Sequence, residues 1–468
     1  MKRKVFSVFC IAMMGFFLVS CGGDSGTDPS GNGSPQNPPS GEKPGEPPSG
    51  GNPGTPPGGG GGGGSSSSSV EYKAAVSITE SGDYSGKTYA STTVDESALL
   101  ISASGTVTVS DMTVTKSGSS NGGDSCNFYG LNAAVLVKDG ANAVITGGSV
   151  TSDASGANGI FSYGGNGGKN GATGDGTTVT VTDTVITTTG DGSGGIMTTG
   201  GGITKAKNLT VKTSGRSSAP IRTDRGGGTV TVEGGSYSSS GLGSPVIYST
   251  ADITVTGAEL ISTQSEGVCI EGKNSISLIN CNMTASNTNM NGNATFLDTI
   301  MIYQSMSGDA DSGTSSFSMT GGKLTSKKGH VFHVTNTNAV INLSGVQIIN
   351  EDNSGVLLSV CDDGWSGAKN IATVNARSQE LSGTILAGSG STLTLNLEEG
   401  SAFTGCVSGS ITNAKGKSVS ASVGQVTVKI DETSSWTLTA DSDIYSFTGD
   451  ASRIILNGHK LTVNGKVF

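Results

Sequence analysis

The stretches VTVEGGS (Val230–Ser236), ITVTGAE (Ile253–Glu259) and ISLINCN (Ile276–Asn282) share one pattern and decide the fold. In each, an apolar–polar–apolar strand runs into a corner of small residues, and the step from Val230 to Ile253 equals the step from Ile253 to Ile276. Such a strand cannot bury its apolar face alone, whereas stacked copies share a core. A repeat of this length therefore indicates one coil of a β-solenoid.

The same pattern extends in both directions along the chain. VTVTDT begins at Val179, FSMTGGK at Phe317, INLSGVQ at Ile341, and a weaker copy, ITKAKN, at Ile203. A second strand follows each corner, as in Ser236-Tyr237-Ser238. A third, short apolar strand usually enters through Gly or Pro: GIFSY at Gly159, GIMTT at Gly195, PIRTD at Pro220, PVIYS at Pro245, GVCIE at Gly267, TIMIY at Thr299 and HVFHV at His330.

These columns predict an all-β protein, a right-handed parallel β-helix with three short strands per coil, because parallel crossovers are almost always right-handed. No stretch after the N-terminus has the apolar spacing of a helix, so we expect almost no α-helix there. We expect the β-helix over 70–468, with an N-terminal cap over 70–104, regular coils with insertions over 105–369, and looser coils with a C-terminal cap over 370–468.

The N-terminus has the features of an export signal. Lys2, Arg3 and Lys4 precede an apolar run too short to span a bilayer, and Leu18-Val19-Ser20-Cys21 resembles a bacterial lipoprotein box. The resemblance implies a signal peptide over 1–20, cleavage before Cys21 and lipidation of its thiol; an ordinary secretion signal that ends at a cysteine is the alternative. The Gly/Pro/Ser-rich stretch up to residue 69 has almost no apolar side chain, so we expect a disordered tether over 21–69. An exported protein, anchored to the bacterial envelope and exposed on the outer membrane, is predicted.

Composition limits the classes of partner. The formal net charge is −10, which argues against a nucleic-acid partner because that role needs a basic face. Five cysteines remain after Cys10 and Cys21, and none forms a CxxC pair, so neither a disulfide framework nor a zinc site is indicated. Asp309–Gly313 starts like a calcium loop but has Thr320 where an EF-hand places Glu, so calcium is only weakly suggested and no other cofactor is. We expect a monomer.

The third strands carry the candidate binding residues. If Ile160 and its equivalents point inward, the alternate residues point outward. Aromatic rings stack on the apolar faces of sugars, and charged groups bind hydroxyls or acidic sugar groups. The sequence thus predicts a shallow carbohydrate-binding groove along this sheet, with an alternative in which insertion loops cover part of it. Its proposed residues are Phe161, Tyr163, Arg222, Asp224, Glu271, Tyr303, His330, His333 and Trp365.

The repeat resembles the pectin-lyase-like β-helix superfamily, which contains polysaccharide lyases and hydrolases. The lyases use a calcium ion bound by carboxylates and a lysine or arginine as the base. The resemblance implies that Asp224 could supply a carboxylate and Arg222 or Arg225 the base. Of four polygalacturonase motifs, only Asp-Asp is present, and Gly329-His330-Val331 departs from Gly-His-Gly. If the protein is an enzyme, the resemblance implies a catalytic set drawn from Arg222, Asp224, Arg225, Glu271, Asp362 and Asp363; a turn is the alternative for Asp362-Asp363.

The absence of a complete catalytic motif favours a binding role over catalysis. The chain resembles the adhesin-like β-helix lipoproteins of bacteria, which implies a tethered surface protein that binds a glycan or a neighbouring cell. A polysaccharide lyase or glycoside hydrolase acting on an acidic polysaccharide is the alternative. A structural or ice-ordering surface is the second alternative, suggested by rows such as Thr178–Thr182, although the irregular steps between repeats argue against it.

Overall fold

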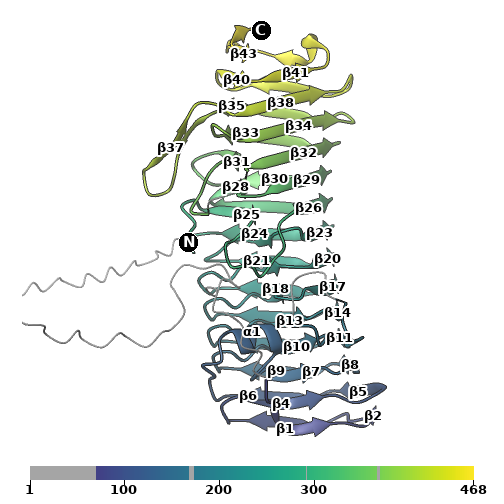
Figure 1. Cartoon of the computed structure of the whole chain (residues 1–468). Coiled ribbons are helices and arrows are strands. Elements are labelled where there is room, and N and C mark those ends of the chain that lie inside the picture. The colour runs from purple at the N-terminus through teal and green to yellow at the C-terminus, as the bar shows by residue number, and fades with distance from the viewer. Residues whose placement is uncertain (1–69, 168–172, 291, 366–368) are drawn as a thin grey trace, which may run out of the picture. The chain divides into compact units, whose positions relative to one another are not determined.

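The computed structural model describes residues 70–167, 173–290, 292–365 and 369–468. The predicted signal peptide, the predicted lipidation site at Cys21 and the predicted tether lie outside these ranges. Within them the chain forms a parallel β-helix, in which successive coils stack from β1 to the C-terminal strands (Figure 1). No helix in the described ranges has the length and apolarity needed to span a membrane.

Sheet A contains the predicted third strands. It has 15 strands, all parallel, and neighbouring strands belong to neighbouring coils. The strands are β1 (Lys73–Ile78), β4 (Glu96–Ile101), β7 (Val135–Val137), β10 (Ile160–Tyr163), β13 (Ile196–Thr199), β16 (Ile221–Thr223), β19 (Ile247–Ser249), β22 (Val268–Glu271), β25 (Asp298–Tyr303), β28 (His330–Thr335), β31 (Val356–Val360), β33 (Glu380–Ala387), β35 (Ala402–Ser408), β39 (Ser435–Leu438) and β42 (Ile454–Ile455).

Sheet B contains the predicted first strands. It has 14 strands, again all parallel. The strands are β2 (Gly82–Asp83), β5 (Thr106–Ser110), β8 (Asn142–Thr146), β11 (Thr178–Thr182), β14 (Gly202–Lys207), β17 (Gly228–Glu233), β20 (Asp252–Thr256), β23 (Ser275–Ile279), β26 (Thr314–Thr320), β29 (Asn338–Ser344), β32 (Ile371–Arg377), β34 (Thr392–Glu398), β38 (Gln425–Ile430) and β41 (Ser446–Thr448).

Sheet C contains the predicted second strands and ends early. It has 10 strands, and no described strand joins it after β30. The strands are β3 (Thr88–Ser91), β6 (Thr113–Lys116), β9 (Ser149–Ser152), β12 (Val185–Thr188), β15 (Thr210–Thr213), β18 (Ser236–Ser239), β21 (Glu259–Ser262), β24 (Asn282–Ser286), β27 (Lys323–Lys328) and β30 (Gln347–Asn350).

The remaining elements are short. They are α1 (Asp124–Tyr129), the antiparallel hairpin β36 (Ser410–Thr412) and β37 (Ser418–Ala421), the strands β40 (Ser442–Ile444), β43 (Leu461–Val463) and β44 (Lys466–Val467), and the 3₁₀ turn η1 (Ala451–Arg453). The expected near-absence of α-helix is confirmed for the described residues, where α1 has six residues. The hairpin projects to one side of the stack in Figure 1.

One apolar core runs through the stack from Ile78 to Leu461. The first-strand column is in register, because Val230 pairs with Ile253, Ile253 with Ile276 and Ile276 with Phe317. The weaker copy is displaced by one residue. Thr204, not Ile203, pairs with Val179 and Val230, and its buried hydroxyl lies 2.6 Å from that of Thr198. That hydroxyl contact lets a polar residue occupy the core position.

The long steps between repeats do not disturb sheet B. Ile276 and Phe317 are separated by a long insertion in sequence, yet they are direct neighbours in the sheet. The extra residues leave the coil before or after sheet A and return before the next sheet B strand. The irregular steps between repeats are therefore no evidence against a regular Thr surface, contrary to the expectation from the sequence. The side chains of sheet B stay in regular rows despite the insertions.

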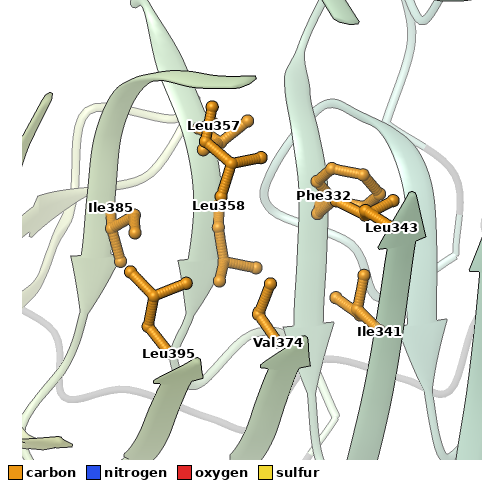
Figure 2. Close-up of a pocket in the computed structure, with 9 residues that line it drawn as sticks. Phe332, Ile341, Leu343, Leu357, Leu358, Val374, Ile385 and Leu395 are labelled. Atoms are coloured by element: carbon orange, nitrogen blue, oxygen red, sulfur yellow. The ribbon is translucent and has the colours of Figure 1, made fainter. Parts of the chain in front are cut away.

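A small apolar void lies in the core where sheet C ends (Figure 2). Its lining comes only from apolar side chains on β28, β29 and β31 to β34, including Phe332, Leu358 and Val374. The void is closed by the sheets and contains no polar group to orient a ligand. We therefore interpret it as imperfect packing where the cross-section of the coil changes.

Candidate functional site

Insertions cover the outer face of sheet A. The outward-facing Phe161 packs with Leu136, Met197 and Ala133, next to the segment that carries α1. Further along, Tyr248, Cys269 and Met301 pack under Ala294 and Trp365, which belong to two different insertions. Leu386 packs under Phe296 and under Ile411 of the β36–β37 hairpin. The outer face of this sheet is therefore a second apolar layer rather than an open surface.

The prediction that these residues line an exposed groove is therefore wrong, because most of them are buried. Six of the nine proposed binding residues are at most 1 % exposed, and Trp365 is 4 % exposed; the six are Phe161, Arg222, Asp224, Glu271, Tyr303 and His333. Only Tyr163 and His330 are partly exposed. The physical reason is the alternative given above, since the insertion loops fold back over these residues.

Two third strands, PVIYS and HVFHV, contain two consecutive apolar residues, and the first of these, Val246 or Val331, was expected to be the equivalent of Ile160; the register differs by one residue. Ile247 pairs with Ile221 and Phe332 pairs with Ile300, so both face the inner core. Their neighbours Tyr248 and His333 therefore face outward. His333 was proposed as a binding residue, but Tyr248 was missed because PVIYS offers two consecutive apolar residues, Val246 and Ile247, for one inward position.

Glu271 is the centre of one buried polar cluster. Its Oε2 accepts hydrogen bonds from the hydroxyls of Tyr248, at 2.5 Å, and Tyr303, at 3.1 Å. Its Oε1 accepts hydrogen bonds from Ser305 and Ser307 in the neighbouring insertion. Burial raises the pKa of the Glu271 carboxyl, and the hydroxyl donors of Ser305 and Tyr248 oppose that shift. The carboxyl is fully paired and joins sheet A to the insertion.

Two arginines form ion pairs beside Glu271. Arg222 Nη2 lies 2.9 Å from Asp224 Oδ2, and Arg225 Nη2 lies 2.5 Å from Oδ1 of the buried Asp309. Burial raises the pKa of Asp224 to about 7; Arg222 opposes this shift and Asp309 adds to it. The Arg225 side chain alone of these four groups reaches the surface, at 29 % exposure. The pair Arg225–Asp309 fastens the insertion to β16.

The two histidines meet at Ser359. His330 Nδ1 and His333 Nδ1 lie 2.8 and 2.7 Å from the Ser359 hydroxyl, and His333 Nε2 lies 3.1 Å from Asp363. All contacts are satisfied when His330 donates to Ser359, Ser359 donates to His333, and His333 donates to Asp363. Asp363 also accepts from Thr295, so this relay connects two insertions. Burial raises the pKa of Asp363, but the hydrogen bonds from His333 and Thr295 prevail and lower it.

Ser, His and Asp in this order are the groups that activate a serine nucleophile. Here Ser359 and His333 are both fully buried, and the Phe296 ring lies 4.9 Å from the His333 ring. A substrate has no access to the hydroxyl in this arrangement, so the relay acts as a fastening between sheet and loops. Asp362, the other half of the Asp-Asp pair, is exposed and accepts a hydrogen bond from Asn370.

The proposed catalytic residues therefore do not form one accessible site. Arg222, Asp224, Arg225 and Glu271 belong to the cluster around β16 and β22, whereas Asp363 belongs to the histidine relay. Among the described residues, no group of three or more His, Cys, Asp or Glu side chains is placed to hold a metal ion. The five described cysteines are buried free thiols.

Among the described residues, a cluster of tyrosines beside the outer face of sheet A is partly exposed, near the N-terminal end of the stack. Tyr163 lies edge-on to Tyr129, with ring centroids 5.8 Å apart, and the Tyr72 hydroxyl donates to the Tyr129 carbonyl at 3.0 Å. All three tyrosines are partly exposed. Lys138 Nζ lies 4.6 Å from the Tyr72 ring centre. We call Tyr72, Tyr129 and Tyr163 the tyrosine cluster.

Arg225 contacts the residue next to this cluster. Its guanidinium is 4.2 Å from the ring centre of Phe128, the neighbour of Tyr129. Sequence reasoning identified Tyr163 but not Tyr72 or Tyr129, because these two belong to the first coil and to an insertion rather than to the repeat. Their proximity depends on how the insertion folds back, and no sequence spacing encodes it.

No protein-family model, curated protein or solved structure matches the chain. The parallel β-helix architecture is established by the stacked sheets. Membership of the pectin-lyase-like superfamily or of the adhesin-like lipoproteins stays a prediction, carried by the coil pattern and the N-terminal residues.

Proposed function

We propose that the chain is an exported, lipid-anchored surface protein, adhesin-like in character, whose β-helix binds carbohydrate at the tyrosine cluster. The observation that carries this proposal is the gathering of three partly exposed tyrosines, Tyr72, Tyr129 and Tyr163, with Lys138 beside them. The other described aromatic side chains on the outer face of sheet A lie under insertions, so on this face the tyrosine cluster is where a ring can meet a ligand.

The chemistry of the cluster suits a sugar. A tyrosine offers an apolar ring face to the C–H face of a pyranose and a hydroxyl to its polar rim. Lys138 and the partly exposed Arg225 are ion-paired with Asp139 and Asp309, so these two side chains add no net positive charge that would select an acidic glycan. Their remaining N–H groups can donate hydrogen bonds to sugar hydroxyls.

The proposed anchor fits such a role. Acylation of Cys21 would attach the protein to a membrane, and the Gly/Pro/Ser-rich stretch that follows would separate the β-helix from the lipid surface. A binding protein that must reach a neighbouring cell or an extracellular polysaccharide benefits from this separation. These N-terminal assignments rest on the residues themselves.

Glycan arrays probed with the purified chain test the proposal. We expect binding to one or more glycans, and we expect Tyr163→Ala and Tyr129→Ala each to weaken it about fivefold, since loss of one stacking ring removes on the order of 1 kcal/mol. Tyr163→Phe retains the ring and should retain most of the affinity. Tyr445→Ala is the matched control, because Tyr445 is 53 % exposed near the opposite end.

Absence of binding to every array, or unchanged affinity in both alanine variants, would contradict the proposal. Release of unsaturated products or new reducing ends from an acidic polysaccharide would instead support the alternative of a lyase or hydrolase. Such activity would require the insertions over Glu271 and Ser359 to open.

A second candidate function has one observation in its favour. The outward face of sheet B carries rows of hydroxyl side chains in register, such as Thr180, Thr231 and Thr254 in successive or nearby coils. A flat Thr array is what an ice-ordering surface needs, but Lys205 and Glu233 interrupt these rows. Thermal hysteresis of the purified chain measures this activity directly, and its absence would leave the carbohydrate proposal alone.

A further inference from the structure

Two acidic side chains lie buried one above the other at the corner between sheets C and A. Val268 and Ile300 pair in register, so Glu266 and Asp298, each two residues earlier, occupy equivalent places in neighbouring coils, about 4.8 Å apart along the stack. The Gly267 N–H donates to the Thr299 carbonyl at 2.8 Å and holds the two corners together. Glu266 is 3 % exposed and Asp298 is 1 % exposed.

The fold itself does not require acidic residues here. In the three preceding coils the same position is Gly194, Ala219 and Pro245, each two residues before the first inward residue of its sheet A strand. Small neutral residues therefore satisfy the corner. Two successive carboxyls at a place that accepts Gly, Ala or Pro need a separate explanation.

Unpaired polar atoms surround the two carboxyls. Asp298 Oδ1, Asn287 Oδ1 and Asn287 Nδ2 are buried and have no hydrogen-bonding partner among the described residues. Asn287 is 1 % exposed, and its amide lies close enough to Glu266 to lower the pKa of that carboxyl. The Thr288 N–H donates to the Gln264 carbonyl at 3.4 Å, which stacks the Asn287 corner on the Glu266 corner. Buried polar atoms without a hydrogen-bonding partner often mark a site for an ion or a water molecule.

No positive side chain neutralises the pair among the described residues. The next residue of the column is His330, which pairs with Asp298, but its Nδ1 is engaged by Ser359. Ser265 donates its hydroxyl to Glu266, which stabilises one carboxylate but supplies no charge. Two buried carboxylates without a counter-ion are unfavourable, because each loses its hydration and repels the other.

We propose that Glu266, Asp298 and the side-chain carbonyl of Asn287 bind a divalent cation, with Ca²⁺ as the best match. The two carboxylates balance its charge, and carboxylate and amide oxygens are the ligands that Ca²⁺ prefers. The ion stabilises the corner between two coils and the start of the insertion that follows Asn287. The site lies apart from the tyrosine cluster and does not depend on carbohydrate binding.

Thermal unfolding of the purified full chain in CaCl₂ and in EDTA tests this site, with calorimetric titration of CaCl₂ as the direct measurement. We expect Ca²⁺ at about 100 times its Kd to raise Tm by a few degrees. Asp298→Asn should abolish both the heat of binding and the shift in Tm. Asp252→Asn, at an exposed carboxylate that bonds Ser275 in a neighbouring coil, is the matched control and should retain both.

A gain-of-function variant protects the test against misfolding of Asp298→Asn. Asn287→Asp adds a third carboxylate, so it should tighten Ca²⁺ binding and lower Tm in EDTA. The proposal is overturned if the wild-type chain shows neither heat nor a shift in Tm with CaCl₂. It is equally overturned if Asp298→Asn raises Tm in EDTA while Ca²⁺ has no effect on the wild type, because the two carboxyls then share a proton instead.

Discussion

Two tyrosines with the same burial differ in what their hydroxyls contact. Tyr237 and Tyr248 are both fully buried. The Tyr237 hydroxyl points into the inner core and has no partner among the described residues, whereas the Tyr248 hydroxyl donates to Glu271 at 2.5 Å. A buried polar group without a partner loses its hydrogen bonds to water and gains none in the protein. A paired group replaces the lost hydrogen bond with one inside the protein.

Substitution by Phe should therefore change stability in opposite directions at these two positions. We expect Tyr237→Phe to raise the free energy of unfolding by about 1 kcal/mol, because it removes an unsatisfied hydroxyl and keeps the ring. Tyr248→Phe should lower it by about 1–3 kcal/mol, because it leaves the Glu271 carboxylate without one donor. Denaturant unfolding of both variants beside the wild type measures the difference, and destabilisation by Tyr237→Phe would show that its hydroxyl has a partner.

Burial of His330 predicts a defined sensitivity to acid. Burial lowers the pKa of His330 to about 4 from 6.5, so below pH 6.5 the unfolded chain binds a proton that the folded chain does not. Stability from this group is complete above pH 6.5 and falls as the pH drops toward 4, by about 1.4 kcal/mol per pH unit and about 3 kcal/mol in all.

A His330→Gln variant should lose this dependence, so the difference in unfolding free energy between wild type and variant should shrink or reverse between pH 6.5 and 4. The comparison must be a difference, because Asp224 acts in the opposite direction. The pKa of its buried carboxyl is raised to about 7 from 3.8, so its contribution decreases as the pH rises through the same range. A wild-type-minus-variant difference that stays constant across these pH values would contradict the burial of a neutral His330.

At the level of strands and corners, glycine has two distinct roles. In the corner before each sheet C strand, the first residue adopts a left-handed conformation, as at Asn208 (φ 52°), Gly257 (φ 65°) and Asn280 (φ 51°). Asn tolerates this region well. The second residue carries a side chain in some coils, but at Gly235 (φ 88°) an added Cβ would lie 2.4 Å from the Leu209 carbonyl oxygen.

The two kinds of corner glycine should respond differently to substitution. Gly257→Asn should change the unfolding free energy by less than about 0.5 kcal/mol, because an added Cβ meets no atom within 4 Å and Asn280 occupies the equivalent place in the next coil. Gly235→Ala should cost about 1–3 kcal/mol through backbone strain. Thermal melts of the two variants test this, and equal effects would mean that the corner does not discriminate the two positions.

The strands could be predicted from the sequence because each repeat carries its own apolar alternation and corner. Errors of one residue arose where the alternation is ambiguous, at ITKAKN, where Thr204 rather than Ile203 faces the core, and at PVIYS, where two apolar residues adjoin. The covering of sheet A by the insertions was harder to predict. Alternation of side chains along a strand assigns them to two faces, but it does not show whether the outer face is exposed to solvent.

A signal for that covering was present in the third strands themselves. Their outward positions include Phe161, Met197, Cys269 and Met301, which are apolar like the inward ones. Sheets buried on both faces read as nearly continuous apolar runs, whereas a half-exposed strand alternates. The meeting of Tyr72, Tyr129 and Tyr163 had no such signal, because it depends on the path of an irregular segment.

In the β-helix as a whole, the hydrogen bonds between coils connect each coil only to its neighbours along the stack. Within sheets A, B and C, each strand except those at the two ends is hydrogen-bonded to the strands of the coils directly before and after it, and the core is continuous along the stack. The stability of such an array is a sum of contributions from each coil and from its contacts with neighbouring coils. A destabilised coil is therefore stabilised only by the two coils beside it.

This one-dimensional bonding has a mechanical consequence. A load that draws one chain end away from the stack acts on the outermost coil alone, since inner coils are held from both sides. Peeling would proceed coil by coil, and each step would break only the few backbone hydrogen bonds of one coil before the next coil takes up the force. If the proposed anchor and surface role hold, the protein under such a load would lengthen in small increments rather than rupture at once.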